Sequence, residues 1–274
     1  MFCHFTKIAT NYKSILDQAK SSDMVVPQSS IRILIAIAII LASVALVGNM
    51  LGGYHFAFME INSFSSLISP ILLENITVFG DGVFLLALVL LFSNRQVRFH
   101  WTILFTSLLS AIVVNVLKNH FAMPRPPAEL DVEIFNLIGR AYQARSFPSG
   151  HSATAFLLAT VCFCYAKNTY LKMSFIILAV LVGLSRVLVG VHWPMDVLVG
   201  GALGIILGLT GVMVTSKWRF GLSAPVHLFT LGLMVMACIM IFVKGNDYTL
   251  ALPMLYIVSA AALLQTIKNY ILMK

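Results

Sequence analysis

A basic residue, a histidine and an acidic residue stand close together in an otherwise apolar stretch of this sequence. The stretch VGLSRVLVGVHWPMDVLVGGALG contains Arg186, His192 and Asp196. A charged side chain in a membrane-spanning segment costs roughly 2.5–3.5 kcal/mol on insertion, so such residues are usually functional and usually paired. The Asp196 carboxylate, four residues after His192, can bind one imidazole nitrogen and leave the other free as a nucleophile. A structural His–Asp pair is the alternative.

A second stretch, GRAYQARSFPSGHSATAF, places three candidate residues at the expected start of a helix. Ser149, Gly150 and His151 directly follow Pro148. Ser149 is a natural N-cap, and Gly150 lets the backbone approach a ligand closely. Because free N–H groups at a helix start bind phosphate readily, this segment is a candidate anion site. The alternative is an ordinary cap beside a surface histidine.

A third stretch, LKNHFAMPRPPAEL, carries two basic residues next to the end of an apolar run. Lys118 closes the run, and Arg125 stands between Pro124 and Pro126. The prolines restrict the backbone and present the guanidinium from a stiff loop. Lysine supplies a point charge and arginine a planar fork that suits phosphate. Taken alone, a positive stop after a hydrophobic helix is the simpler interpretation.

The elements that must position these residues are membrane helices. Of the 274 residues, 59% are hydrophobic and 10% are charged, and the mean hydropathy is +0.94. Soluble domains carry about 25% charged residues. Since about 20 apolar residues span a bilayer, we predict an all-α polytopic membrane helix bundle with eight spans. These are residues 31–52, 72–93, 101–118, 151–166, 173–191, 195–215, 225–243 and 249–267.

The segment before the first span, residues 1–30, is expected to be a separate cytoplasmic unit. Its apolar residues recur at helical spacing, with lysines between them. These residues are Phe5, Ile8, Tyr12, Ile15 and Ala19. An amphipathic helix that lies on the membrane surface and a disordered tail both fit this pattern.

The net charge of +8 is explained by topology and does not indicate a nucleic-acid partner. If the amino terminus is cytoplasmic, twelve of the eighteen basic residues fall on the cytoplasmic side, as the positive-inside rule requires. Five of the other six belong to the three stretches above. We therefore predict cytoplasmic termini, with residues 118–150 and 186–194 gathered into an anion site on the opposite side.

The three stretches together form a recognisable pattern. They read K-x6-RP from Lys118 to Pro126, PSGH from Pro148 to His151, and SR-x5-H-x3-D from Ser185 to Asp196. The pattern resembles the type-2 phosphatidic acid phosphatase superfamily, which includes bacterial membrane lipid phosphatases and vanadium haloperoxidases. Every defining position matches, in order and spacing, over about residues 72–208. The resemblance implies a six-helix phosphatase core over residues 31–215, with two additional transmembrane helices over residues 225–267.

The resemblance also implies a role for each motif residue. His192 would be the nucleophile that forms a phosphohistidine, and Asp196 would orient it. His151 would protonate the leaving group and then activate water. The residues implied to hold the phosphoryl oxygens are Lys118, Arg125, Ser149, Gly150 and Arg186. Phosphoryl transfer depends mainly on positioning and charge neutralisation, which suits this set. No metal ligand set is evident, and no metal or other cofactor is implied.

The function implied is that of a metal-independent lipid phosphate phosphatase in the bacterial inner membrane, with its active site facing the periplasm. Candidate substrates are undecaprenyl diphosphate, phosphatidylglycerol phosphate, phosphatidic acid and a lipid A phosphate. A phosphotransferase that passes the phosphohistidine group to a second lipid would use the same residues. A catalytically silent lipid-binding protein is the alternative from another class, and the sequence indicates no protein partner.

Several polar residues lie outside the motifs or are not part of their pattern. Asp81, in the stretch ENITVFGDG, is expected to cap the following helix, with a place at the substrate entrance as the alternative. Arg140 and Arg145 could contact a second phosphate or belong to a solvated loop. His120 is expected to be an ordinary loop histidine.

Three further patterns concern packing. Glycines recur every four residues at Gly200, Gly204 and Gly208, which predicts close helix–helix contact along one face. The three tryptophans fall near span ends, as interfacial tryptophans do. The four cysteines show no metal or redox spacing, and we expect them to be inert apolar side chains.

Overall fold

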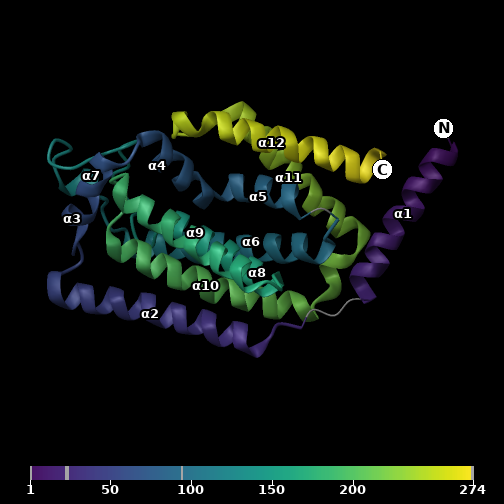
Figure 1. Cartoon of the computed structure of the whole chain (residues 1–274), viewed down its shortest axis with the longest axis horizontal. Coiled ribbons are helices and arrows are strands. Elements are labelled where there is room, and N and C mark those ends of the chain that lie inside the picture. Colours follow the sequence, from purple (N-terminus) through teal and green to yellow (C-terminus); the bar gives the residue numbers. More distant parts are fainter. Residues whose placement is uncertain (1, 22–24, 94, 273–274) are drawn as a thin grey trace.

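The computed structural model describes residues 2–21, 25–93 and 95–272, and within these ranges all regular structure is helical. The α-helices are α1 (Phe2–Ser21), α2 (Gln28–Gly52), α3 (Phe58–Ser63), α4 (Pro70–Thr77), α5 (Gly82–Phe92), α6 (Val97–Phe121), α7 (Pro126–Glu129), α8 (Gly150–Tyr165), α9 (Thr169–Leu188), α10 (Pro194–Lys217), α11 (Ala224–Lys244) and α12 (Leu252–Thr266). Shorter helical segments are η1 (Phe64–Leu67), η2 (Val78–Gly80), η3 (Arg219–Leu222), η4 (Thr249–Ala251) and η5 (Ile267–Leu272). Figure 1 shows the long helices running side by side.

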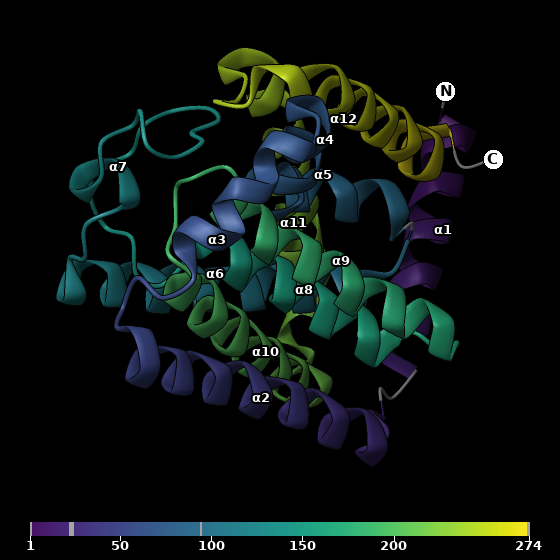
Figure 2. The same cartoon turned by 60° about the vertical axis from the view of Figure 1, so that its left-hand side comes forward.

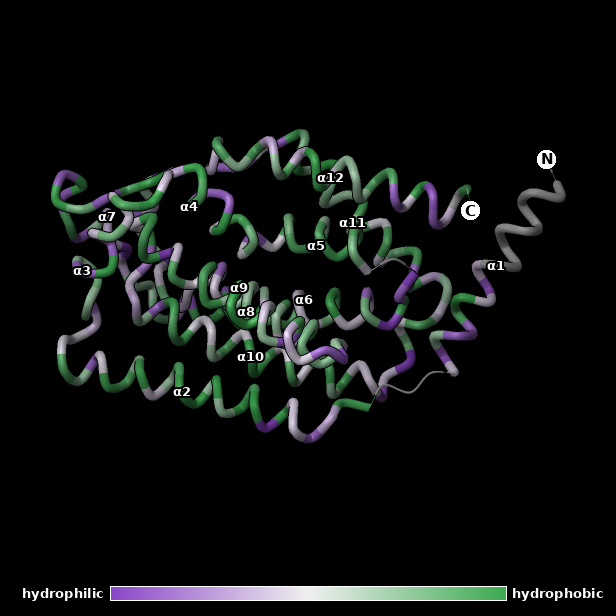
Figure 3. Tube along the Cα trace, in the orientation of Figure 1, coloured by the Kyte–Doolittle hydropathy of each residue, from purple (hydrophilic) through white to green (hydrophobic). Residues whose placement is uncertain are grey.

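The helices form a polytopic membrane bundle, as predicted. Six described helices are long and apolar enough to cross a bilayer, namely α2, α6, α9, α10, α11 and α12. Large apolar side chains point outward from them: Ile39 is 59% exposed, Ile112 64% and Phe229 62%. Such faces are stable against lipid and unfavourable against water. Polar residues gather at the two ends of the bundle, where purple segments appear in Figure 3.

The second predicted span, residues 72–93, is not one straight helix. It consists of Pro70–Gly80 and Gly82–Phe92, which are bent by 81° relative to each other. The bend falls at Asp81, whose carboxylate accepts hydrogen bonds from Val83 N at 2.8 Å and Phe84 N at 2.9 Å. The predicted cap is therefore confirmed, and it starts a new helix in a new direction. Hydropathy reports apolar length and carries no information about such a break.

The fourth predicted span is the short helix α8, which packs closely on α10. A Cβ atom on Gly200 would lie 2.6 Å from Ser149 O, and one on Gly204 would lie 2.3 Å from Ala153 O. Only glycine permits this approach, so the packing predicted from the glycine repeat is confirmed. Because the contact continues to the first turn of α8, it brings the starts of α8 and α10 together. The Ser149 N–H donates to Asp196 O at 3.0 Å.

The amino-terminal segment contains the helix α1, so that of the two interpretations left open the structure shows the helix over residues 2–21. Leu16 packs with Val97 and Leu222, and Tyr12 and Ile15 lie against this cluster. The side chains of Phe5 and Ile8 lie outside the described part of the chain. The position of α1 on a membrane surface stays a prediction.

The last two helices, α11 and α12, pack against α5 on one side of the bundle. The connection between them is fastened to α4, because Leu250 N donates to Glu74 Oε2 at 2.7 Å. Figure 2 shows this connection above α4, and Figure 1 places both termini at the opposite end of the bundle. The division of the chain into residues 1–30, 31–215 and 225–267 stays a proposal.

The tryptophans and the cysteines test two expectations, namely that the tryptophans lie at the membrane interface and that the cysteines are apolar side chains. Trp193 is only 1% exposed, and its indole N–H donates to Pro124 O at 3.0 Å, so the interfacial interpretation is wrong for this residue. Trp218, in contrast, is 46% exposed at a helix end. Cys164 and Cys238 are buried free thiols, as expected for apolar filling, and Cys3 lies outside the described side chains.

Candidate active site

His192 and Asp196 form the predicted pair. His192 lies in the connection between α9 and α10, Asp196 lies in the first turn of α10, and both are buried. His192 Nδ1 is 3.1 Å from Asp196 Oδ2, which is hydrogen-bonding distance. No described residue hydrogen-bonds to His192 Nε2. The carboxylate therefore fixes the ring and leaves the Nε2 lone pair free to react.

Three further donors hold the Asp196 carboxylate in place. Ser146 Oγ and Trp193 N, the latter at 3.0 Å, donate to Oδ2, and Tyr54 OH donates to Oδ1. Burial and the neighbouring carboxylate raise the pKa of Tyr54, so its phenol stays a neutral donor. Tyr54 belongs to the α2–α3 connection, 142 residues from Asp196 in sequence. The His192–Asp196 pair is thus positioned by the α2–α3 connection, through Tyr54, and by the loop before α8, through Ser146. Neither residue belongs to the three motifs.

The charge on His192 is controlled by its surroundings. Burial, followed by the positive charges of Arg125, Lys118 and Arg186, lowers the pKa of His192 well below its usual value. All three cations of the motifs therefore lie near enough to His192 to act on it. The imidazole is neutral at pH 7, which is the form that can attack an electrophile.

Two of these cations are held by backbone carbonyl groups of the loop before α8. Lys118 Nζ donates to Arg145 O at 2.6 Å and to Ser146 O at 3.2 Å. Arg125 Nε donates to Ala144 O at 3.0 Å, and its Nη1 donates to Val191 O, beside His192, at 3.1 Å. The ends of α6 and α9 are thereby joined to one loop. The stiff presentation expected of Arg125 is achieved by these bonds.

The third cation, Arg186, lies at the end of α9 and is 2% exposed. Its Nη1 donates to Thr77 Oγ1 at 2.6 Å and to Tyr248 OH at 2.7 Å. Its Nε is buried and has no partner among the described residues. Because a buried N–H group without an acceptor is costly, this donor is available for a bound anion.

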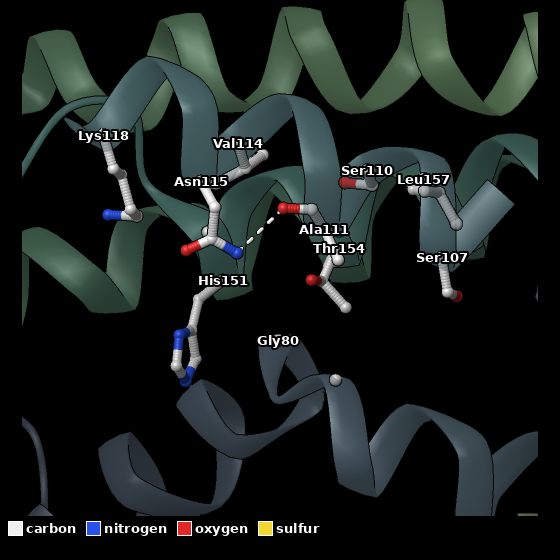
Figure 4. Close-up of a pocket in the computed structure, with 12 residues that line it drawn as sticks. Gly80, Ser107, Ser110, Ala111, Val114, Asn115, Lys118, His151, Thr154 and Leu157 are labelled. Atoms are coloured by element: carbon white, nitrogen blue, oxygen red, sulfur yellow. Dashed lines mark hydrogen bonds between the residues drawn. The ribbon is translucent and has the colours of Figure 1, made fainter. Parts of the chain in front are cut away.

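The first turn of α8 supplies the remaining motif residues. Ser149 Oγ accepts from Ser152 N at 3.3 Å, which confirms the predicted N-cap. The His151 side chain makes no hydrogen bond to the described residues, and it faces a cavity beside Lys118 (Figure 4). Gly80 packs against it, since a Cβ there would lie 2.7 Å from His151 Cβ. Gly80, which precedes the bend at Asp81, is thus in close contact with the first turn of α8.

The assembled site is a strongly positive cluster, in which Arg186 is buried and Lys118 and Arg125 are half-buried. In the part of the chain that the structure describes, no carboxylate forms an ion pair with Lys118, Arg125 or Arg186, which bond to neutral oxygens instead. Unpaired buried charges are unfavourable, so the site favours an anionic ligand, and phosphate matches its donors. Within those same ranges, no three His, Cys, Asp or Glu side chains are grouped to hold a metal ion.

Comparison with known proteins decides the family. The PAP2 superfamily matches residues 99–222. A lipid A 1-phosphatase of Rhizobium johnstonii is 30% identical over 167 residues, which are 53% of this chain and 67% of that protein. An undecaprenyl-diphosphatase of Sulfolobus acidocaldarius is 32% identical over 138 residues, which are 47% of this chain and 61% of that protein. A crystal structure of Aquifex aeolicus LpxE, at 32% identity, covers 57% of this chain and 92% of that one, with a TM-score of 0.48.

This chain belongs to the PAP2 superfamily. It is therefore a phosphatase, as the motifs predicted, and every motif residue from Lys118 to Asp196 lies inside the matched region. Three residues that support the site lie outside it, namely Tyr54, Thr77 and Tyr248. Sequence reasoning missed all three, because no local pattern distinguishes them from other tyrosines and threonines. Ser146 was missed as well, although it stands only three residues before Ser149.

The polar residues outside the PAP2 motifs occupy the rim of the site. Arg145 is exposed, and its Nη2 donates to Asn115 Oδ1 at 2.9 Å. Arg140 is exposed and lies over the Tyr142 ring, 5.3 Å from its centroid. His120 is exposed as expected, but it lies in the last turn of α6 and not in a loop, so that part of the prediction is wrong. A contact of either arginine with a second phosphate stays a prediction.

Proposed function

We propose that this PAP2 phosphatase removes phosphate from a membrane lipid through a phosphohistidine on His192. The observation that carries the proposal is the geometry of His192: Nδ1 is bound to Asp196, Nε2 has no described partner, and three cations without ion-pair partners lower its pKa. Such an arrangement combines a neutral nucleophile with a binding site for phosphoryl oxygens.

In the first step, His192 Nε2 attacks phosphorus and the phosphorus–oxygen bond to the lipid breaks. His151 donates its proton to the departing oxygen, while Asp196 stabilises the charge that develops on His192. Lys118, Arg125 and Arg186 neutralise the transferring group. The residues Ser149 and Gly150, at the start of α8, complete the phosphate-binding set.

In the second step, the neutral His151 takes a proton from water. The resulting hydroxide attacks phosphorus, the phosphorus–nitrogen bond breaks, and inorganic phosphate leaves. His192 recovers its lone pair, and His151 again carries the proton needed for the next cycle. The chain's own side chains supply every proton transfer in this scheme.

The test is phosphate release by purified enzyme in detergent from a lipid A 1-phosphate, undecaprenyl diphosphate, phosphatidylglycerol phosphate and phosphatidic acid. We expect turnover of at least one lipid in chelator, and inhibition by vanadate, whose trigonal-bipyramidal form resembles the transition state. Glycerol 3-phosphate is the soluble control. Activity that disappears in chelator and returns only with a divalent ion would refute this mechanism.

The same panel separates the two alternatives. A phosphotransferase would move labelled phosphate to a second lipid rather than to water, because only the acceptor differs. A catalytically silent lipid-binding protein would release nothing from any lipid. The unbonded nitrogen of His192 and the open side of His151 favour a hydrolase over a silent protein, since binding alone needs neither group.

The active site is proposed to face the periplasm of a bacterial inner membrane. The charge distribution supports this orientation, and both termini lie at the end of the bundle away from the site (Figure 1). Reporter fusions after Arg98 and after Ala141 should therefore report opposite sides, with the second outside. Fusions that report the same side, or Ala141 in the cytoplasm, would contradict the orientation.

Tyr248 is proposed to position Arg186 from the α11–α12 connection. Replacement of Tyr248 by phenylalanine removes the acceptor 2.7 Å from Arg186 Nη1 while keeping the ring. Because a hydrogen bond to a charged group contributes about 1.5–3 kcal/mol, we expect kcat/KM to fall by about tenfold or more. Vanadate inhibition should weaken by the same factor. The matched control is Tyr256→Phe on α12, whose ring stacks on Phe242 away from the site.

A further inference from the structure

A cavity of about 280 Å³ runs from the candidate catalytic residues along the bundle. His151 and Lys118 line one end and Ser107 lines the other, with the wall formed by α6, α8 and the turn at Gly80 (Figure 4). The volume lies just below the usual range for small-molecule sites of about 300–1,000 Å³. The cavity therefore suits the part of a lipid next to its phosphate, and not a whole lipid.

The cavity opens sideways toward the surface of the bundle. Of its lining residues, Ala111 and Asn115 on α6 and Gly82 on α5 are exposed. A Cβ atom on Gly82 would meet no atom within 4 Å, so the rim is open at this point. A lipid can thus enter from the bilayer while its phosphate reaches Lys118 and His151.

Three hydroxyl groups line this cavity and are left without partners. Ser107, Ser110 and Thr154 make no hydrogen bond to any residue that the structure describes, and Ser107 Oγ is buried. Ser110 is only 6% exposed. Burying a hydroxyl without a hydrogen bond is unfavourable, most of all at membrane depth. Ser107 Oγ is therefore available to a ligand with polar atoms, and the buried Ser110 and the half-buried Thr154 can bond to the same ligand.

Hydroxyls on the spanning helices can satisfy themselves within their own helix. Several donate to the carbonyl four residues earlier, as Thr106, Thr210, Thr215 and Thr230 do. Thr160 and Ser259 also lack a partner, but neither lines the cavity. Ser107, Ser110 and Thr154 differ from these two by their position, because all three line the cavity that leads to Lys118 and His151.

The spacing of these hydroxyls matches the polar atoms of an acylated lipid. Thr154 follows His151 by three residues, about 4.5 Å along α8, and Ser110 precedes Lys118 by eight, about 12 Å along α6. In acylated glycerol or sugar phosphates, the first acyl carbonyl carbon lies five bonds from phosphorus and its oxygen six, on the order of 5–6 Å through space at bond lengths near 1.5 Å. A polyprenyl chain carries no polar atom beyond its phosphates.

We propose that this cavity, lined by Ser107, Ser110 and Thr154, selects lipid phosphates with acyl carbonyl or hydroxyl groups near the phosphate, over polyprenyl phosphates. The inference rests on the proposed function and names its substrate class. Thr154 donates to the carbonyl nearest the phosphate. Ser110 and Ser107 bond to a second acyl carbonyl or to a hydroxyl group that lies further from the phosphate.

The test compares phosphatidic acid with its dialkyl ether analogue, which has the same chains and no carbonyl groups, and with farnesyl diphosphate. We expect wild-type enzyme to prefer the ester by about tenfold in kcat/KM, because the ether lacks the two carbonyl acceptors and each lost hydrogen bond lowers kcat/KM by about threefold. The double variant Ser110→Ala, Thr154→Val should lose this preference and keep its rates on the ether and the prenyl substrate. Thr210→Val is the control, because that exposed hydroxyl bonds within α10.

A binding measurement separates selection of the lipid by the cavity from the catalytic steps. The inactive His192→Ala protein should bind the ester lipid about tenfold more tightly than the ether lipid, and the added double variant should remove the difference. If this preference holds but no lipid releases phosphate, the proposed function fails and the cavity assignment stands. Equal binding of ester and ether, or equal losses on all three substrates, would overturn the cavity assignment.

Discussion

Replacing His192 by alanine is expected to lower kcat by at least about 10⁴-fold, or roughly 5.5 kcal/mol. The change removes the atom that attacks phosphorus, and with it the covalent intermediate. The anion site itself stays, because Lys118, Arg125 and Arg186 are held by carbonyl and hydroxyl oxygens and not by the imidazole. The variant should therefore still bind vanadate or phosphate while it turns over almost no lipid.

The decisive measurement is trapping of the intermediate with labelled substrate. A quench in alkaline detergent is needed, because phosphohistidine hydrolyses in acid. Wild-type enzyme and the control His120→Ala, which alters an exposed histidine at the end of α6, should both carry label. Label on the His192→Ala protein would show that another residue is the nucleophile.

The second large effect is expected for His151→Ala, and it should depend on the leaving group. A lipid alkoxide needs a proton to depart, so the variant should lose about 10²–10⁴-fold on a lipid monoester. p-Nitrophenolate leaves without a proton. If the enzyme accepts p-nitrophenyl phosphate, formation of the phosphoenzyme from it should fall by less than about tenfold, since His192 and the three cations are unchanged.

The comparison of the two substrates serves as its own control, because both are measured on one protein preparation. A single-turnover experiment should show label that forms rapidly and is released slowly, since His151 is also the proposed base for hydrolysis. Equal losses on both substrates would remove His151 from the role of general acid and leave it as a binding residue.

The residues that do the chemistry could be predicted from sequence because phosphoryl transfer restricts them strongly. His192 and Asp196 must stand one helical turn apart, and Ser149 must stand at a helix start, so these relations are visible in local spacing. The supporting contacts could not be predicted. Tyr54 reaches Asp196 across 142 residues, and Thr77 reaches Arg186 across 109. Tertiary packing alone creates such contacts.

The fold, like the site, could be predicted only in part from the sequence. Apolar length is enough to identify α2, α6, α9, α10, α11 and α12 as spans. It is not enough for residues 72–93, where the Asp81 cap and the close contact of Gly80 with His151 turn the helix by 81°. The cap was recognised in the sequence, but its effect on direction depends on α8, which lies elsewhere in the chain.

The contact between Arg186 and Tyr248 also has a consequence for the synthesis of the protein. Tyr248 lies 62 residues beyond Arg186. At about 5–20 residues per second, the ribosome needs roughly 3–12 s to make this interval. During that time Thr77 is already made, whereas the phenol partner of Arg186 is still absent. A chain that stalls in this interval lacks one of the two hydrogen-bond acceptors that Arg186 Nη1 has in the complete fold.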